Sequence, residues 1–132
     1  MHDEIEEQLS LAEECLEEAK LLLTNRFYRG AASRAYYSMF HAAKALLALK
    51  GIATKKHSGV LRMLGLEFVN KGFLEDKYID AYKMAFDIRG GADYGENIEI
   101  GSEVAEDIIK GAEEFIGKVY ELIESFKKNK FV

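Results

Sequence analysis

An arginine, a hydroxyl and an imidazole share one face of the most apolar long stretch of this sequence, residues 27–50. Steps of three and four residues return to the same side of an α-helix, because each residue turns the chain by about 100°. The members of this stripe are Gly30, Arg34, Ser38, His41 and Ala45. A guanidinium binds phosphate oxygens, and an imidazole donates or accepts a proton near neutral pH. The small residues of the stripe let another backbone approach closely, so this face is the first place to look for chemistry.

A second set of polar residues follows an apolar stripe later in the chain. Arg89 continues the spacing of Ile79, Tyr82 and Phe86, and it precedes a glycine-dense break that carries Asp93 and Tyr94. An arginine on a core-facing stripe needs partners, because burying an unpaired guanidinium is costly. A third set, Lys55, Lys56 and His57, makes a small basic turn.

Two interpretations fit these residues equally well by periodicity. In the structural one, Arg34 and Arg89 pair with Asp93 or Glu67, and His41 is a half-buried interface residue. In the functional one, the arginines bind an anion or a nucleotide, His41 acts as a donor or general acid, and a tyrosine stacks on a base. The candidates for the stacking tyrosine are Tyr94 and Tyr37.

The elements that position these residues are helical. Residues 27–50 lack proline and are rich in alanine and leucine, which predicts one central helix of ~36 Å. Residues 3–24 and the segment from Ser102 to the C-terminal lysines each repeat apolar residues at steps of four and three. Shorter helices are expected at 58–72, with Ser58 as its cap, and at 75–89, ending in a glycine-rich loop or distorted helix end.

These elements predict an all-α fold. We expect an up-and-down antiparallel bundle of four main helices plus a short fifth, which forms one domain over residues 1–132. The composition is 48% hydrophobic and 31% charged, which is typical of a globular chain. Neither a domain linker nor an internal repeat interrupts the sequence.

Charge and cysteine content narrow the function classes. The net charge of −5 argues against a surface built to follow a nucleic-acid backbone, although it allows a local nucleotide or RNA-end site. The single cysteine, Cys15, excludes an internal disulfide and fits a packed thiol in a reducing cytoplasm. The acidic N-terminus is unlike a signal peptide, and no run of about 20 apolar residues predicts a membrane span. A cytoplasmic location is therefore expected.

Familiar cofactor and metal signatures are absent from the sequence. It contains no P-loop, no dinucleotide-binding glycine fingerprint, no paired Cys/His zinc spacing and no helical HExxH. Only three histidines occur, and His2 lies at the N-terminal end. We therefore expect neither a metal nor a cofactor.

Four ordered strings give the sequence a family resemblance. SRAYYSMFHAAKALLALKG, KKHSGV, FVNKG and RGGADY follow one another, and together they resemble the HEPN domain family, more narrowly its small stand-alone prokaryotic members of largely uncharacterised function. The similarity runs from about residue 11 to residue 126. It implies an up-and-down helical bundle, commonly a homodimer. Many members act together with a minimal nucleotidyltransferase, often as a toxin–antitoxin pair.

The resemblance also implies a catalytic site, and this chain departs from the family's motif at one position. Active members are metal-independent ribonucleases that use an Arg-x(4–6)-His motif at a dimer cleft. The arginine carries over to Arg89, but the chain continues Gly-Gly-Ala-Asp-Tyr and contains no later histidine. Arg34 and His41 match the spacing formula, yet they lie inside the central helix, about 10 Å apart along its axis.

Three function classes follow from these residues. The first is a HEPN-type module that binds a nucleotide or RNA and works with a minimal nucleotidyltransferase. The second is a metal-independent endoribonuclease in which His41 or His57 replaces the family histidine beside Arg89. The third is a non-catalytic structural or adaptor dimer. The departure after Arg89 favours the first over the second.

Overall fold

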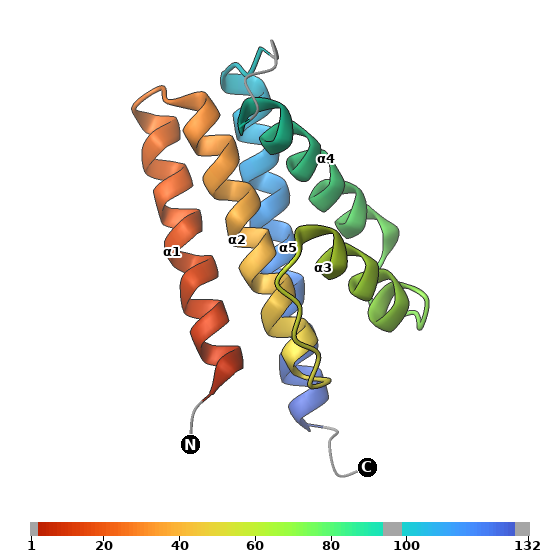
Figure 1. Ribbon diagram of the computed structural model, residues 1–132. Coiled ribbons are helices and arrows are strands. Elements are labelled where there is room, and N and C mark those ends of the chain that lie inside the picture. Colours follow the sequence, from red (N-terminus) through yellow and green to blue (C-terminus); the bar gives the residue numbers. More distant parts are fainter. Residues whose placement is uncertain (1–2, 94–98, 129–132) are drawn as a thin grey trace.

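The computed structural model describes residues 3–93 and 99–128, with only the backbone for 91–93, and every regular element in these ranges is helical (Figure 1). The elements are α1 (Glu4–Thr24), α2 (Tyr28–Ala48), α3 (His57–Leu64), the π-helical turn η1 (Gly65–Val69), α4 (Asp76–Asp93) and α5 (Ser102–Lys128). In Figure 1 the four long helices run alternately up and down, and α3 is the short fifth helix. The predicted all-α bundle is confirmed.

Helix α2 is the centre of the bundle. It contacts α1, α3, α4 and α5. Twelve of its 21 residues are buried, so more than half of the helix belongs to the core. The buried positions include six alanines, which keep the surface of α2 shallow and allow neighbouring helices to approach closely: Ala31, Ala32, Ala35, Ala42, Ala43 and Ala45.

The stripe that carries Arg34 and His41 faces α1. A Cβ atom on Gly30 would lie 3.3 Å from the Leu22 side chain of α1, so the glycine permits this close contact. Ser38 is fully buried, and its hydroxyl donates to the carbonyl of Ala35 at 2.6 Å. The small residues of the stripe therefore accept a helix of the same chain.

Two predicted helix boundaries were wrong. Helix α3 begins one residue before Ser58, with Lys56 at the cap position and Val60 N–H donating to the Lys56 carbonyl at 3.0 Å. Helix α4 continues through Gly90 as far as Asp93, where the sequence predicted a break. A glycine costs a helix only about 1 kcal/mol relative to alanine. The packing of α4 against α2 and α5 outweighs that cost.

Within the described ranges, no helix is both long and apolar enough to cross a membrane.

The central position of α2 generates a stability prediction. Leu46 is fully buried in α2, and Leu46→Ala removes buried methyl groups and leaves a cavity. We expect a loss of about 3 kcal/mol in the free energy of unfolding by urea denaturation. The matched control is Leu21→Ala, because Leu21 is 65% exposed on α1, and it should change the stability by less than about 0.5 kcal/mol. Equal effects of the two substitutions would contradict a central α2.

Candidate functional site

Arg34 lies half-buried between α2 and α1. Its Nε is 3.6 Å from Glu18 Oε1, so the two groups form an ion pair but no hydrogen bond. Its Nη2 donates a hydrogen bond to Cys15 Sγ at 3.7 Å. Burial raises the pKa of the Cys15 thiol, and the neighbouring guanidinium only partly opposes that shift. Cys15 therefore remains a protonated, packed thiol. Arg34 pairs with Glu18, whereas Glu67, which the structural interpretation offered as a partner, binds Lys50 and Lys71.

Arg89 lies near the end of α4 against a cluster of aromatic rings. Its Nη1 donates to the Tyr37 hydroxyl at 3.1 Å. Its Cζ is 5.3 Å from the ring centroid of Tyr36, 5.6 Å from that of Phe86 and 5.8 Å from that of Tyr37. Each such contact is attractive because the face of an aromatic ring carries partial negative charge. Three aromatic rings therefore contact the guanidinium of the arginine on the apolar stripe.

Tyr37 brings the two arginines together. The Arg34 Cζ lies 5.1 Å from the Tyr37 ring centroid, while Arg89 binds the hydroxyl of the same residue. Two cations from different helices, α2 and α4, therefore contact one half-buried tyrosine. A guanidinium has five N–H donors in a fixed planar fork, which matches the oxygens of a phosphate. This arrangement suits a phosphate group beside an aromatic ring.

His57 joins the same cluster through Tyr36. The Tyr36 hydroxyl lies 2.6 Å from His57 Nδ1 and 3.3 Å from the Tyr82 hydroxyl. Burial raises the pKa of Tyr36 to about 12, and it raises the pKa of Tyr82 further. Both phenols therefore keep their protons at neutral pH. Tyr36 has one proton to donate, to His57 or to Tyr82, and it can accept from the other.

His41 lies on the α1 side of α2 and belongs to a separate chain of hydrogen bonds. Its Nδ1 is 2.8 Å from Gln8 Oε1, and Gln8 Nε2 donates to Glu4 Oε1 at 3.3 Å. A carbonyl oxygen only accepts, so Nδ1 of His41 carries a proton. Burial lowers the pKa of His41, and the charges of Lys44 and Arg34 lower it further. The imidazole is therefore neutral at pH 7, with its lone pair on Nε2.

The predicted site residues thus fall into two groups. Arg34 and Arg89 meet at Tyr37, and His57 adjoins them through Tyr36. His41 instead bonds to Gln8 of α1, although its ring and that of His57 both contact the Phe40 ring, with centroids 5.5 and 4.5 Å away.

The other predicted residues have less defined roles. Lys55 and Lys56 are exposed in the segment before α3. The backbone of Asp93 ends α4, but its side chain and all of Tyr94 lie outside the described residues, so the expected Arg89–Asp93 pair stays a prediction. Glu67 binds Lys50 and Lys71 at 3.5 and 3.0 Å, so its proposed pairing with an arginine was wrong.

Sequence reasoning gave no role to Lys44 or Gln8, and it named Tyr37 only as a ring that could stack on a base. Tyr37 and Lys44 lie three and ten residues after Arg34, which places them on one face of α2. That spacing was a usable signal. The role of Gln8 had no such signal, because periodicity does not say which residue of a neighbouring helix faces His41.

Comparisons with known proteins find relatives over most of the chain. A family model described as HEPN domain matches residues 5–123. The protein "Putative toxin MJ0605" of Methanocaldococcus jannaschii is 43% identical over 119 residues, which cover 90% of this chain and 88% of that protein.

Two solved structures share the fold. The crystal structure of TT1696 from Thermus thermophilus has a TM-score of 0.79 at 18% identity, and the match covers 91% of this chain and 98% of that one. The crystal structure of ST0689, an archaeal HEPN homologue, has a TM-score of 0.75 at 19% identity over 93% of this chain and 99% of that one.

The environment of His41 generates a prediction about pH. A histidine whose pKa is lower in the folded state binds its proton more readily after unfolding, so it destabilises the fold as the pH falls below about 6.5. Above that pH both states carry a neutral imidazole and the effect vanishes. When the pH is lowered from 7.5 to 5, we expect the Tm of His41→Gln to fall less than the Tm of the parent. Parallel curves for the two proteins would contradict the lowered pKa.

Proposed function

This chain belongs to the HEPN domain family, and from that premise we propose that it is a nucleotide- or RNA-binding module that acts with a minimal nucleotidyltransferase partner, as one half of a toxin–antitoxin-like pair. The observation that carries the proposal is the contact of Arg34 and Arg89 with Tyr37. The name of the Methanocaldococcus jannaschii relative supports the toxin part of the proposal.

Local charge supports an anionic ligand despite the net charge of −5. Helix α2 contains Arg29, Arg34 and Lys44 and no aspartate or glutamate. The acidic residues that give the chain its net charge lie on other elements, such as the outer face of α1, where Glu6, Glu7 and Glu13 are exposed. A ligand with one or a few phosphates therefore meets the cations of α2, one of which, Arg34, also pairs with Glu18 of α1, while the acidic surface elsewhere repels long polyanions.

We further propose that the module is a homodimer when it lacks its partner. Light scattering should return about twice the monomer mass at micromolar concentration. The interface of such an isologous dimer should bury at least ~1,000 Å². A minimal nucleotidyltransferase encoded beside this chain should copurify with it in a complex of defined mass. A monomeric mass under both conditions would contradict the assembly.

One observation favours a second candidate, a metal-independent endoribonuclease. The Arg89 guanidinium lies 5.3 Å from the Tyr36 ring, and His57 Nδ1 lies 2.6 Å from the Tyr36 hydroxyl. Of the two candidate substitutes for the family histidine, His57 is thus the one linked to Arg89. In this reading Arg89 stabilises charge on the phosphorane, and the His57 imidazole transfers the proton.

The binding site generates a prediction for single-stranded RNA. We expect Arg89→Gln to weaken binding of a short fluorescent RNA at least tenfold in an anisotropy titration, because a charge-assisted hydrogen bond is lost. Arg34→Gln should act in the same direction. The control is Arg62→Gln, which removes an exposed charge on α3 and should change the affinity less than twofold. Equal affinities of all four proteins, or no RNA binding by the parent, would support the structural or adaptor alternative.

The purified parent protein also distinguishes the enzyme candidate from the binding module. When the protein is incubated with total RNA in EDTA and the RNA is run on a denaturing gel, a binding module leaves the RNA intact. Cleavage that disappears in His57→Gln but persists in His41→Gln would establish the endoribonuclease instead.

A further inference from the structure

A row of partly exposed residues runs along α2 from Arg34 toward the C-terminal end of the helix, beside the seam with α1, and we call it the α2 stripe. Five residues at steps of three and four lie on it, and each is partly exposed: Arg34, Tyr37, His41, Lys44 and Ala48. At 1.5 Å per residue the stripe is ~21 Å long. Because α2 contains no acidic residue, the stripe offers only cationic, aromatic, imidazole and small groups to a ligand.

The stripe ends in a groove of about 340 Å³ at the C-terminal end of α2. Four apolar residues line it, and we call them its floor: Leu47, Ala48, Ile52 and Ala53. Lys44 and Lys55 line the groove as well. Clefts of roughly this size hold small organic molecules. The carbonyls at the end of α2 are already bonded, for instance Ala48 O by Gly51 N–H at 3.0 Å and Leu47 O by Ile52 N–H at 3.1 Å. The floor therefore suits the apolar face of a ligand.

Gly51 lines this groove, and Gly59 packs against another of its lining residues, Thr54. Gly51 has a φ of +70°, which a glycine adopts without strain, and a side chain there would meet no other atom within 4 Å. A Cβ atom on Gly59 would lie 2.6 Å from the Thr54 hydroxyl, so a side chain there would force Thr54 to shift. Thr54 lines the groove, and this contact fixes its wall.

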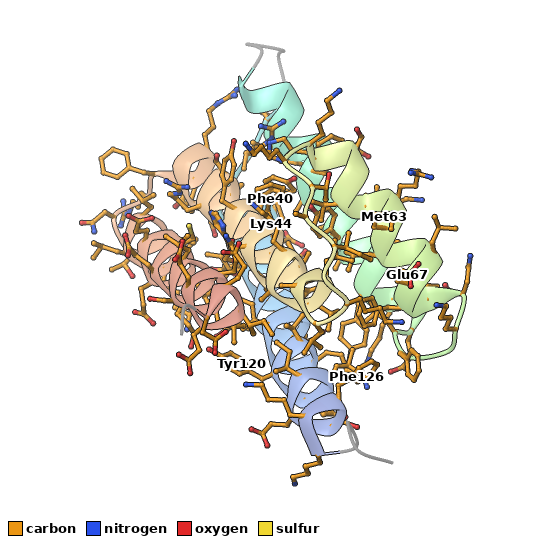
Figure 2. All side chains as sticks on the ribbon, turned by 60° about the horizontal axis from the view of Figure 1, so that its bottom comes forward. Phe40, Lys44, Met63, Glu67, Tyr120 and Phe126 are labelled. Atoms are coloured by element: carbon orange, nitrogen blue, oxygen red, sulfur yellow. The ribbon has the colours of Figure 1, made fainter. Side chains whose placement is uncertain are left out.

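Lys44 connects the stripe to the groove. It belongs to both, and its Nζ lies 5.3 Å from the Phe40 ring centroid, which orients the ammonium group along α2. Figure 2 shows Phe40 and Lys44 close together on α2, between α1 and α3. Phosphates that contact the arginines at Tyr37 would next meet Lys44 and then the apolar floor.

We infer that the groove receives the terminal nucleoside of a single-stranded RNA whose phosphates follow the α2 stripe. The inference rests on the proposed RNA-binding function and names a subsite within it. The apolar floor takes the face of the base, and Lys44 and Lys55 take the last phosphates. Glu4, at the first turn of α1, also lines the groove. Its carboxylate repels a further phosphate, so the strand ends there instead of passing through.

The test compares an intact hexanucleotide with two versions that lack the terminal base at the 5′ or the 3′ end, each labelled at the opposite end. We expect the parent to bind the intact strand about tenfold more tightly than one of the two abasic strands. Ala48→Phe fills the groove and should bind the intact strand as weakly as that abasic one. The control is Leu21→Phe, which adds the same ring at an exposed position ~25 Å away along α1 and should behave as the parent.

A second readout needs no variant. AMP added to the ¹⁵N-labelled parent should shift the backbone amide signals of Gly51 and Thr54 saturably. Equal affinity of the parent for intact and abasic strands, or an Ala48→Phe protein that folds and keeps the preference, would overturn the groove assignment alone. A parent that binds no RNA would overturn the proposed function, and the groove assignment with it.

Discussion

The close packing of α1 on α2 is the constraint on which the site depends. Gly30 allows the Leu22 side chain to approach, and buried alanines make α2 narrow enough for several helices to surround it. Because α1, α3, α4 and α5 all contact α2, only a narrow part of its circumference is left exposed. The charged residues of α2 and His41 therefore lie along that exposed part or at the seam with α1.

The same packing determines how the polar groups behave. Arg34 is held at the seam by Glu18 and Cys15, and Arg89 is placed over aromatic rings by α4. Each arginine is thus restrained before any ligand arrives, which lowers the entropy cost of binding an anion. Tyr37 is the element common to both, since it contacts one guanidinium with its ring and binds the other through its hydroxyl.

Much of the fold was predictable from the sequence because helix periodicity reports burial directly. The apolar steps of α1 and α5, the central role of residues 27–50 and the all-α bundle all follow from it. The continuation of α4 through Gly90 was not predictable, since contacts with other helices override the local preference of glycine.

The residues of the candidate site were predictable from the sequence, but the residues that they contact were not. Periodicity put Arg34 and His41 on one face, but their partners differ: Arg34 contacts the Tyr37 ring, and His41 bonds to Gln8.

The most direct test of the two-arginine site observes the guanidinium groups themselves. In protein labelled with ¹⁵N-arginine, the Nε–H signals of Arg34 and Arg89 can be followed while a short single-stranded RNA is added. The account predicts that both signals shift together with one saturation curve, while the signal of exposed Arg62 stays in place. Saturable RNA binding that leaves the signals of Arg34 and Arg89 unchanged would contradict the assignment of the ligand to Tyr37 and its two arginines.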